Sequence, residues 1–374
     1  MKKILILTSE RTGTGHKSSA NALEKQLKDL NYEVKQVDCF STMKKTGELL
    51  ENSYIPITTK FPLIFYIAFL FSQVFPDFIS YLMYIKSRKM LKKEILNYNP
   101  DLIISNHPMF TKAISHLLKK EKLNIPFFID VIDLVNPPKI WLDKNADIIF
   151  VPTDLIKSNY VKKGVESNKL IVSGFPIRND IEKRTSPKTI KDYINILLVN
   201  PSVSLKKNIH FVKEVSKIKN TNINIICGRD VKLYNKLIKE QVSGKISQNV
   251  KVHSFVNNMN EFLENAHILL TKAGPNMILE GARSGTAIVI TGFIKGQEND
   301  NYKYVVDNNF GFKCDDPKKI YMQLNDFIKN HKLDECLKNV ISADCNDGTK
   351  IITDYITDFF QKEKSTKKES LHYK

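Results

Sequence analysis

The stretch TKAGPNMILEGA, from Thr271 to Ala282, joins the end of an apolar run to the start of a helical pattern. Gly274 and Pro275 mark a tight turn, and Glu280 follows early in the predicted helix. Backbone amides at a helix N-terminus lack intrahelical acceptors, so such a turn can bind phosphate, and a nearby carboxylate can hold a sugar diol. An ordinary strand-to-helix connection has the same appearance, and both interpretations remain open for this stretch alone.

The same strand, turn and helix pattern recurs along the chain. Apolar runs such as KILILT and DLIISNH alternate with longer helical patterns, and the series restarts at INILLVN after a polar stretch. This alternation predicts parallel sheets covered by helices on both faces. We therefore expect two α/β domains with a cleft between them. The predicted parts are a first domain at 1–180, a linker at 181–193, a second domain at 194–350, and a closing helix with a charged tail at 351–374.

Composition limits the class of protein and of partner. The chain has 374 residues, 42% hydrophobic and 26% charged, which is a globular composition. Its formal charge of +17 indicates an anionic partner, either nucleic acid, an acidic membrane surface or a phosphorylated ligand. The 5 cysteines lack metal-ligand spacing and fit a reducing compartment. The N-terminal MKKILILTSE has too few apolar residues for a signal peptide and predicts a buried first strand. The protein is therefore expected to be cytosolic or attached to the cytosolic side of another structure.

One segment differs from the alternating pattern. Residues 61–85 are mostly apolar and aromatic, with no charge between Lys60 and Asp77. Pro62 and Pro76 bracket a stretch shorter than the roughly 20 residues that cross a bilayer. The basic residues that follow directly are Lys86, Arg88, Lys89, Lys92 and Lys93. The pattern fits either an interfacial contact with an anionic membrane or a buried helix pair with a solvated basic face.

The candidate residues of the first domain follow its strands. In TSERTGTGHKSSANAL, Gly13 and Gly15 allow the backbone to turn sharply or to approach a ligand, and His16 is expected at the mouth of this loop. Ser18 or Ser19 is expected to cap the next helix. Further polar residues follow later strands, in NHP at 106–108 and in DVIDLVNPPKIW, which contains Asp130, Asp133 and Trp141.

The second domain has four polar motifs, each placed directly after a predicted strand. They are CGRD at 227–230, HSFVNNM at 253–259, TKAGPNMILE at 271–280 and GFIKGQENDN at 292–301. Parallel strands end at the same edge of a sheet, so the four motifs are expected along one rim. A cation, free amides and carboxylates at one rim suit a nucleotide sugar.

Taken in order, these motifs resemble the diacylglycerol glycosyltransferases, that is, the monogalactosyl- and glucosyl-diacylglycerol synthases. These enzymes are related to the lipid-linked N-acetylglucosaminyltransferase of peptidoglycan synthesis. The resemblance rests on TGTGHKSSANAL, CGRD, VNNMNEFLENAHILLTKAGPNMILEGA and GQENDN, and runs from about residue 4 to 312. It implies a GT-B fold of two Rossmann-like domains, with the acceptor in the first domain and the nucleotide sugar in the second. The implied reaction inverts the anomeric centre and needs no metal.

The resemblance also implies roles for individual residues. His16 would be the base that faces the acceptor hydroxyl, and Asp133 would be the alternative base or an orienting group. Gly15 would contribute to ligand binding. On the donor side, Arg229, Gly274, Pro275 and Asn276 would hold the UDP phosphates, Phe255 and Val256 would border the uracil, Glu280 would bind the ribose, and Gln297 and Glu298 would bind the transferred sugar.

The implied partners are a UDP-sugar, diacylglycerol or a related lipid, and an anionic membrane surface contacted through 61–93. No cofactor, no metal and no nucleic acid is expected. The implied setting is peripheral, on the cytoplasmic side of a bacterial cell membrane.

Two departures from the family pattern leave other functions open. The loop NPSVS at 200–204 stands where the family has a glycine-rich loop, and Pro137 and Pro138 replace a His-Pro element. Proline and a bulky valine do not allow the same close approach of backbone to phosphate. The alternatives are a UDP-sugar epimerase of the same fold, a degenerate sugar- or lipid-binding relative, and a nucleic-acid-binding protein.

Overall fold

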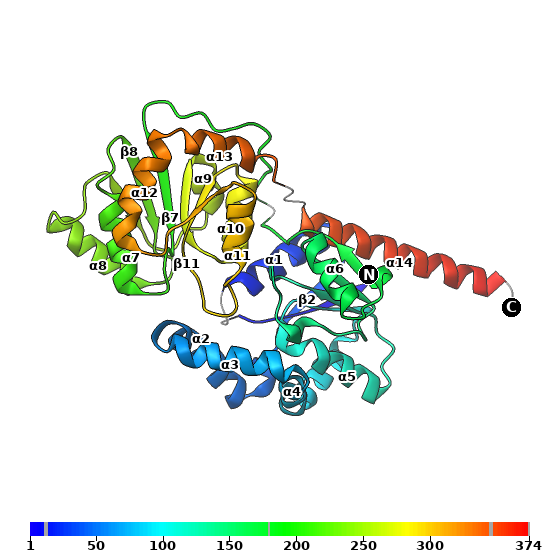
Figure 1. The fold of residues 1–374 in the computed structure, drawn as a ribbon. Coiled ribbons are helices and arrows are strands. Elements are labelled where there is room, and N and C mark those ends of the chain that lie inside the picture. Colours follow the sequence, from blue (N-terminus) through cyan, green and yellow to red (C-terminus); the bar gives the residue numbers. More distant parts are fainter. Residues whose placement is uncertain (11–13, 179, 344–346, 373–374) are drawn as a thin grey trace. The chain divides into compact units, whose positions relative to one another are not determined.

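The computed structural model describes residues 1–10, 14–178, 180–343 and 347–372, and it divides into two compact units. The first contains Met1–Ile55, Phe71–Asn179 and Asn346–Lys374, and the second contains Pro56–Leu70 and Asp180–Cys345. Each unit has its own six-stranded parallel sheet (Figure 1). The expectation of two α/β units with parallel sheets is therefore confirmed.

The first sheet has the strand order β2-β1-β3-β4-β5-β6. Its strands are β1 (Lys3–Thr8), β2 (Glu33–Asp38), β3 (Leu102–Ser105), β4 (Phe127–Asp130), β5 (Ile148–Val151) and β6 (Leu170–Val172). The helices of this part are α1 (Thr14–Asp29), α4 (Pro76–Tyr98), α5 (Thr111–Glu121), α6 (Asp154–Lys162) and α14 (Gly348–His372). Helices α2 (Lys45–Lys60) and α3 (Pro62–Val74) are divided between the two units, because Pro56–Leu70 belongs to the second. Helices α1 and α14 pack on one face of the sheet, while α4 and α5 lie on the other (Figure 1).

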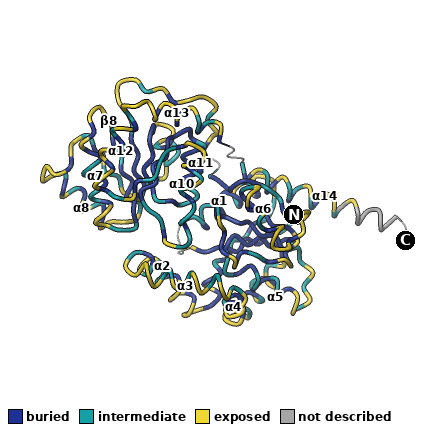
Figure 2. Tube along the Cα trace, viewed as in Figure 1, coloured by how far each residue is buried: buried dark blue, intermediate teal, exposed yellow. Residues whose placement is uncertain are grey.

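The core of the first unit shows why these segments form strands. Ile4, Ile6, Leu102, Ile104 and Phe128 alternate along β1, β3 and β4 and are buried against α1 and α14. A strand buried on both faces reads as a continuous apolar run, and β1 is of this kind (Figure 2). The C-terminal helix belongs to this core, because its Ile352, Ile356 and Phe360 are buried in the same cluster.

The second sheet has the order β12-β11-β10-β7-β8-β9. Its strands are β7 (Ile194–Val199), β8 (Thr221–Ile226), β9 (Val250–His253), β10 (Ile268–Lys272), β11 (Ala287–Gly292) and β12 (Gly311–Lys313). Its helices are α7 (Leu205–Val215), α8 (Val231–Val242), α9 (Met259–Asn265), α10 (Pro275–Arg283), α11 (Asn301–Asp307), α12 (Pro317–Lys329) and α13 (Lys332–Val340). Helices α7, α8, α12 and α13 bury the main core, and α9 and α10 pack on the other face (Figure 1).

The segment between the sheets is attached to the second unit by a buried lysine. Lys188 Nζ donates to the carbonyls of Leu263 and Ala266 and to the hydroxyl of Thr286, at 2.6–2.7 Å. Burial lowers the pKa of Lys188 to about 7. Three acceptors around one ammonium group fix this irregular segment against the end of α9 and the start of β11.

One boundary differs from expectation in a way that changes the site. The first helix was expected from about Ser18, with Ser18 or Ser19 as its cap, but α1 begins at Thr14. His16 therefore lies in the first turn of a helix and not in a loop. Ser19 is buried inside the helix, where its hydroxyl donates to the carbonyl of Pro176. Gly13 lies outside the described residues.

Candidate active site

His16 and Asn106 hold each other by two hydrogen bonds at the carboxyl edge of the first sheet. His16 Nδ1 lies 2.7 Å from the Asn106 carbonyl oxygen, and Asn106 Nδ2 donates to the His16 carbonyl at 3.0 Å. A carbonyl can only accept, so Nδ1 carries the proton and Nε2 presents a lone pair. The arrangement fixes the tautomer that a general base needs.

The surroundings of His16 keep it uncharged. Its ring lies 4.4 Å from that of His107 and 6.4 Å from that of Trp141. Burial lowers the pKa of His16 to about 4, although the bond to the Asn106 carbonyl acts in the opposite direction. The pKa of His107 is also lowered, first by burial and then by the charge of His16. At neutral pH, His16 is therefore available to accept a proton.

Asp133 is linked to this group through an aromatic side chain. Trp141 Nε1 donates to Asp133 Oδ2, and both residues are buried. Asp133 and Trp141 follow the end of β4, and Asn106 follows β3, so the edge of the sheet collects residues that are distant in the sequence. Asn106 belongs to the NHP motif, but it was not predicted to be the partner of His16, because the sequence does not show which strands are neighbours.

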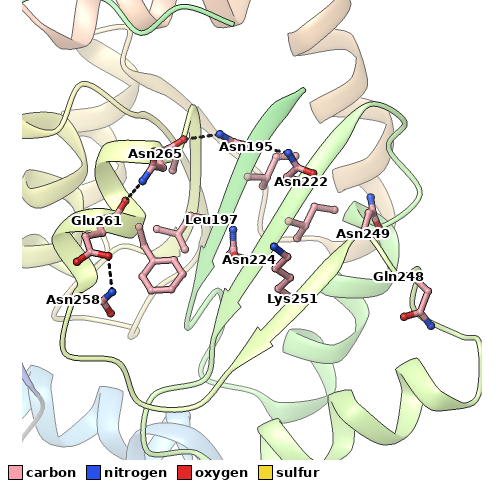
Figure 3. Close-up of a pocket in the computed structure, with 14 residues that line it drawn as sticks. Asn195, Leu197, Asn222, Asn224, Gln248, Asn249, Lys251, Asn258, Glu261 and Asn265 are labelled. Carbon is pink, nitrogen blue, oxygen red and sulfur yellow. Dashed lines mark hydrogen bonds between the residues drawn. The ribbon is translucent and has the colours of Figure 1, made fainter. Parts of the chain in front are cut away.

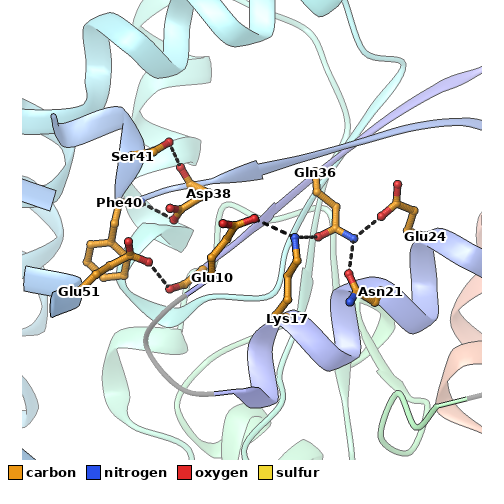
Figure 4. Close-up of polar contacts among 10 residues, drawn as sticks. Glu10, Lys17, Asn21, Glu24, Gln36, Asp38, Phe40, Ser41 and Glu51 are labelled. Atoms are coloured by element: carbon orange, nitrogen blue, oxygen red, sulfur yellow. Dashed lines mark hydrogen bonds and ion pairs between the residues drawn. The ribbon is translucent and has the colours of Figure 1, made fainter. Parts of the chain in front are cut away.

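Acidic residues lie near Lys17 of α1 and the carboxyl end of β2 (Figure 4). Lys17 pairs with Glu10 at 3.1 Å and donates to Gln36 at 3.0 Å, which ties the start of α1 to β2. Ser9 donates to Glu51 Oε1 at 2.9 Å.

The carboxyl end of β2 adds another acid to this group. Burial and the charges of Glu51 and Glu10 raise the pKa of Asp38 to about 6. Backbone hydrogen bonds from Phe40 and Ser41 oppose this rise. Among the described residues, this part of the edge therefore repels phosphate. It suits an uncharged hydroxyl better, with Gly15 close by in the first turn of α1.

In the second unit, α10 begins with an N-terminus that no side chain caps. Gly274 is the N-cap residue and Pro275 occupies the first helical position. Asn276 Nδ2 is buried and has no hydrogen-bond partner within the protein. Glu280, one turn further on, is buried at 3% exposure. The first turn thus offers backbone amides and a side-chain amide to an anion, at the positive end of the helix dipole.

A lysine and a glutamate side chain connect the start of α10 to the loop that follows β11. Glu298 accepts from the Ile294 amide at 2.8 Å and pairs with Lys272. A Cβ atom at Gly274 would lie 3.1 Å from Lys272 Nζ, so glycine leaves the lysine room beside the helix N-terminus. Lys272 belongs to the motif TKAGPNMILE, but no role was predicted for it from the sequence. Glu298 is committed to these contacts, whereas Gln297 is only half-buried.

The remaining donor-side candidates lie on exposed loops. The Arg229 guanidinium, after β8, lies 5.5 Å from the centre of the Phe255 ring, after β9. Phe255 is exposed and Val256 is half-buried. All four motifs of the second domain thus follow β8, β9, β10 and β11 at the carboxyl edge, as their order predicted.

The loop NPSVS, at 200–204 after β7, is packed against the end of β11. Pro201 accepts a hydrogen bond from the Thr291 hydroxyl at 2.6 Å, and a Cβ at Gly292 would lie 3.2 Å from the same carbonyl. Asn200 has a φ of 42°, a left-handed conformation that asparagine tolerates better than most residues. The loop therefore supports the end of β11.

A hollow of about 470 Å³ lies elsewhere on the second sheet (Figure 3). It is lined by residues near the amino ends of β7, β8 and β9, with α9 on one side. Its polar lining includes Asn195, Asn222, Asn224, Asn249, Lys251 and Glu261. The hollow contains none of the candidate residues, because those lie at the opposite, carboxyl edge.

Segment 61–85 forms α3 and the first part of α4 and is largely exposed. No residue of α3 is buried. Its exposed apolar side chains are Leu63, Ile64, Ile67, Leu70, Phe71 and Val74, and α4 and the residue before it add Phe75, Phe78, Tyr81, Leu82 and Ile85. The interpretation of this segment as a buried helix pair is therefore wrong for α3. An apolar surface of this kind marks an interaction site.

No individual helix of the described chain has the length and apolar character of a membrane span, and only α2 together with α3 reaches that threshold, across a 120° bend. The described residues also contain no group of three or more His, Cys, Asp or Glu side chains placed like metal ligands.

The fold is that of the GT-B glycosyltransferases. A solved structure of MurG from Acinetobacter baumannii aligns with a TM-score of 0.65 at 16% identity, over 96% of this chain and 100% of that one. The predicted GT-B fold is confirmed.

Two family models match the chain. Residues 16–177 match the model of monogalactosyldiacylglycerol (MGDG) synthase, and residues 199–346 match the C-terminal domain of glycosyltransferase family 28. The resemblance that the motifs indicated is confirmed by these two domains.

Curated relatives agree with the family models. The probable chloroplastic monogalactosyldiacylglycerol synthase of Nicotiana tabacum is 26% identical over 355 residues, covering 85% of this chain and 63% of that protein. The processive diacylglycerol beta-glucosyltransferase of Bacillus mycoides (strain KBAB4) is 25% identical over 356 residues, covering 90% and 89%. The chain thus spans less than two thirds of the length of the tobacco relative.

The lowered pKa of His16 predicts an acid-sensitive fold. His16 has a pKa of about 4 when folded and about 6.5 when unfolded, so the unfolded state takes up the proton first as pH falls. Its contribution to stability is full above pH 6.5 and is lost as pH falls towards 4. Between pH 7 and pH 5 this amounts to about 2 kcal/mol, which urea unfolding of the wild type and His16→Gln would measure.

The comparison isolates His16, because His107 titrates in both proteins. The exposed His331 provides the control, and His331→Gln should keep the wild-type pH dependence. An equally steep loss of stability in His16→Gln would contradict the assignment.

Proposed function

We propose that the protein is an inverting glycosyltransferase that moves a hexose from a UDP-sugar to diacylglycerol or a related lipid at a membrane surface. The observation that carries the proposal is the start of α10, in a chain that matches the two family models. Its N-terminus is uncapped, an unpaired amide of Asn276 lies in the first turn, and the buried Glu280 lies on the next. Phosphate at the helix start and the ribose diol at Glu280 match these groups.

On the donor side, positive charge would stabilise the leaving diphosphate. The α10 dipole, Lys272 beside Gly274, and Arg229 after β8 supply it. The uracil would lie against Phe255 and Val256, and Gln297 would contact the sugar. The proposal includes no metal ion, since these groups provide the charge.

On the acceptor side, His16 would act as the base. Its Nε2 accepts the proton of the lipid hydroxyl while that oxygen bonds to the anomeric carbon. The bond from this carbon to the diphosphate breaks, and UDP leaves with the electron pair.

The membrane contact would come from α3 and the start of α4. Their exposed apolar side chains suit the boundary between headgroups and acyl chains. Of the basic residues that follow, Lys92 already pairs with Glu121 and Arg88 lies over Tyr84. Lys86, Lys89 and Lys93 are exposed. Each such cation contributes about 1 kcal/mol near an anionic leaflet. We place this contact on the cytoplasmic side.

The direct test is enzymatic. Purified protein, diacylglycerol liposomes and a panel of UDP-sugars should give UDP and a glycolipid identified by mass spectrometry. His16→Ala should lower kcat by about 10²–10⁴-fold, the usual contribution of a general base. His331→Ala should retain the wild-type rate. If no donor yields either product or UDP, the proposed activity is refuted.

The role of Glu280 predicts a selective loss of nucleotide affinity. Glu280→Gln should weaken UDP binding roughly tenfold in calorimetry, because the charged acceptor for the ribose hydroxyls is gone. Binding of 2′-deoxy-UDP should change little. Glu261→Gln, in the hollow at the other edge, is the matched control. Equal losses for both nucleotides would assign Glu280 a structural role.

Membrane binding depends on the apolar face of α3. Ile67→Glu with Phe71→Glu should reduce co-sedimentation with vesicles containing anionic phospholipid by more than about tenfold, since two buried apolar side chains are worth roughly 3–6 kcal/mol. Val242→Glu, at an exposed site at the end of α8, should bind as the wild type does. Unchanged binding of the double variant would exclude this surface.

A further inference from the structure

Three buried polar side chains form a row beneath the start of α1. Strands β1, β3 and β4 are paired in register, so the residues at their carboxyl ends, Thr8, Asn106 and Asp130, are neighbours across the sheet. Their Cα atoms are about one strand spacing, roughly 4.8 Å, apart. All three residues are at most 1% exposed.

The row continues the apolar core. Side chains alternate between the two faces of a strand, so each member of the row lies on the same face as the residue two positions before it. Those residues are Ile6, Ile104 and Phe128, which are packed against α1 and α14. The sheet therefore changes from apolar to polar at its last position, directly below the helix turn that carries His16.

The row contains more acceptors than donors. Thr8 Oγ1, Asn106 Oδ1 and both carboxyl oxygens of Asp130 have no hydrogen-bond partner within the protein. Asp130 lies on the strand next to Asn106, whereas β3 separates Asp130 from Thr8. If Asp130 is ionised, both of its oxygens can only accept, and Asn106 Oδ1 gains no donor from it. If Asp130 is protonated, its O–H can donate to Asn106 Oδ1. The protonated form therefore gives Asn106 Oδ1 a donor, and the ionised form does not.

The electrostatics favour the same form. Burial raises the pKa of Asp130 to about 8, and no neighbouring charge contributes to this rise. The titratable groups on the elements that pack around this edge are His16 of α1, His107 after β3, Asp133 after β4 and Tyr355 of α14. Both histidines have lowered pKa values and are neutral near pH 7.

We propose that Asp130, held as the uncharged acid, is a positioning residue that fixes the Asn106 side chain and, through it, the backbone of His16 at the start of α1. Asn106 Nδ2 donates to the His16 main-chain carbonyl, and the Asn106 main-chain carbonyl faces His16 Nδ1. An Oδ1 held in place keeps Nδ2 on the His16 carbonyl, and this keeps the imidazole in reach of the Asn106 main-chain carbonyl. The consequence is a single tautomer with Nε2 unprotonated. This role rests on the proposed function of His16 as the base.

The first test does not require activity. In protein labelled with ¹⁵N-histidine, His16, assigned by comparison with His16→Gln, should show a protonated Nδ1 and an unprotonated Nε2. Asp130→Leu removes the donor and should give a mixture of tautomers. Asp130→Asn keeps a donor and should retain the wild-type signal. An unchanged tautomer in Asp130→Leu would overturn the proposal, even if no transferase activity is found.

The free energy of unfolding distinguishes a positioning role of Asp130 from a purely structural one. The folded pKa of Asp130 is above its ordinary value of 3.8, so the folded state binds the extra proton and stability falls as pH rises from about 4 to about 8. Both variants should therefore be at least as stable as the wild type at pH 7. Asp143 is the control, because its buried carboxylate is bonded to Ser115 and Asn145 and Asp143→Asn should lose stability without altering the tautomer.

The protonated form of Asp130 also predicts an effect on kcat. Asp130→Leu should lower kcat about 10- to 100-fold, the size seen when an outer-shell partner that orients a metal-ligating histidine is removed, with an unchanged KM for the UDP-sugar. Wild-type kcat should fall as pH rises through about 8, where Asp130 ionises, and Asp130→Asn should lack this fall. A carboxyl ¹³C signal that shows Asp130 ionised at pH 7 would refute the proposal.

Discussion

Every strand in each sheet runs parallel to its neighbours, and this constraint places all of the candidate chemistry. A parallel strand can reach the next one only by a crossover that returns the chain to the starting edge. Each strand therefore brings the residues that follow it to one edge. In the first unit this edge unites His16, Asn106 and Trp141, and in the second it unites Arg229, Phe255 and the start of α10.

The two edges differ in their electrostatic character. The second edge has Lys272, Arg229 and the N-terminus of α10, all of which favour an anion. Near the start of α1 in the first unit, Glu10, Asp38 and Glu51 make the described surroundings unfavourable for phosphate. A chain with a net charge of +17 thus keeps one edge suited to a neutral hydroxyl and the other to a diphosphate.

Burial has two distinct effects in the first unit. Along β1, β3 and β4 it stabilises the core through apolar side chains, and α14 completes that core. At the last position of the same strands it acts on polar groups and makes a histidine and an aspartic acid neutral. Sites that store unsatisfied polar groups in this way reduce stability in exchange for a fixed geometry. The exposed α3 is the opposite case, since apolar side chains there face solvent and are explained by a partner outside the chain.

The sequence by itself determined the alternation of strands and helices, the two α/β units, the resemblance to the diacylglycerol glycosyltransferases and the edge on which the motifs of the second unit lie. These follow from local features, because hydrophobic periodicity and turn residues act over a few positions. It missed the short β12, whose GFK run is too brief for a periodic pattern, and it placed the start of α1 too late. Only the tertiary structure decided that His16 binds Asn106, 90 residues away, that Lys272 pairs with Glu298, and that α3 is exposed. Those facts depend on which strands and helices become neighbours, and packing between distant segments leaves no periodic trace along the chain.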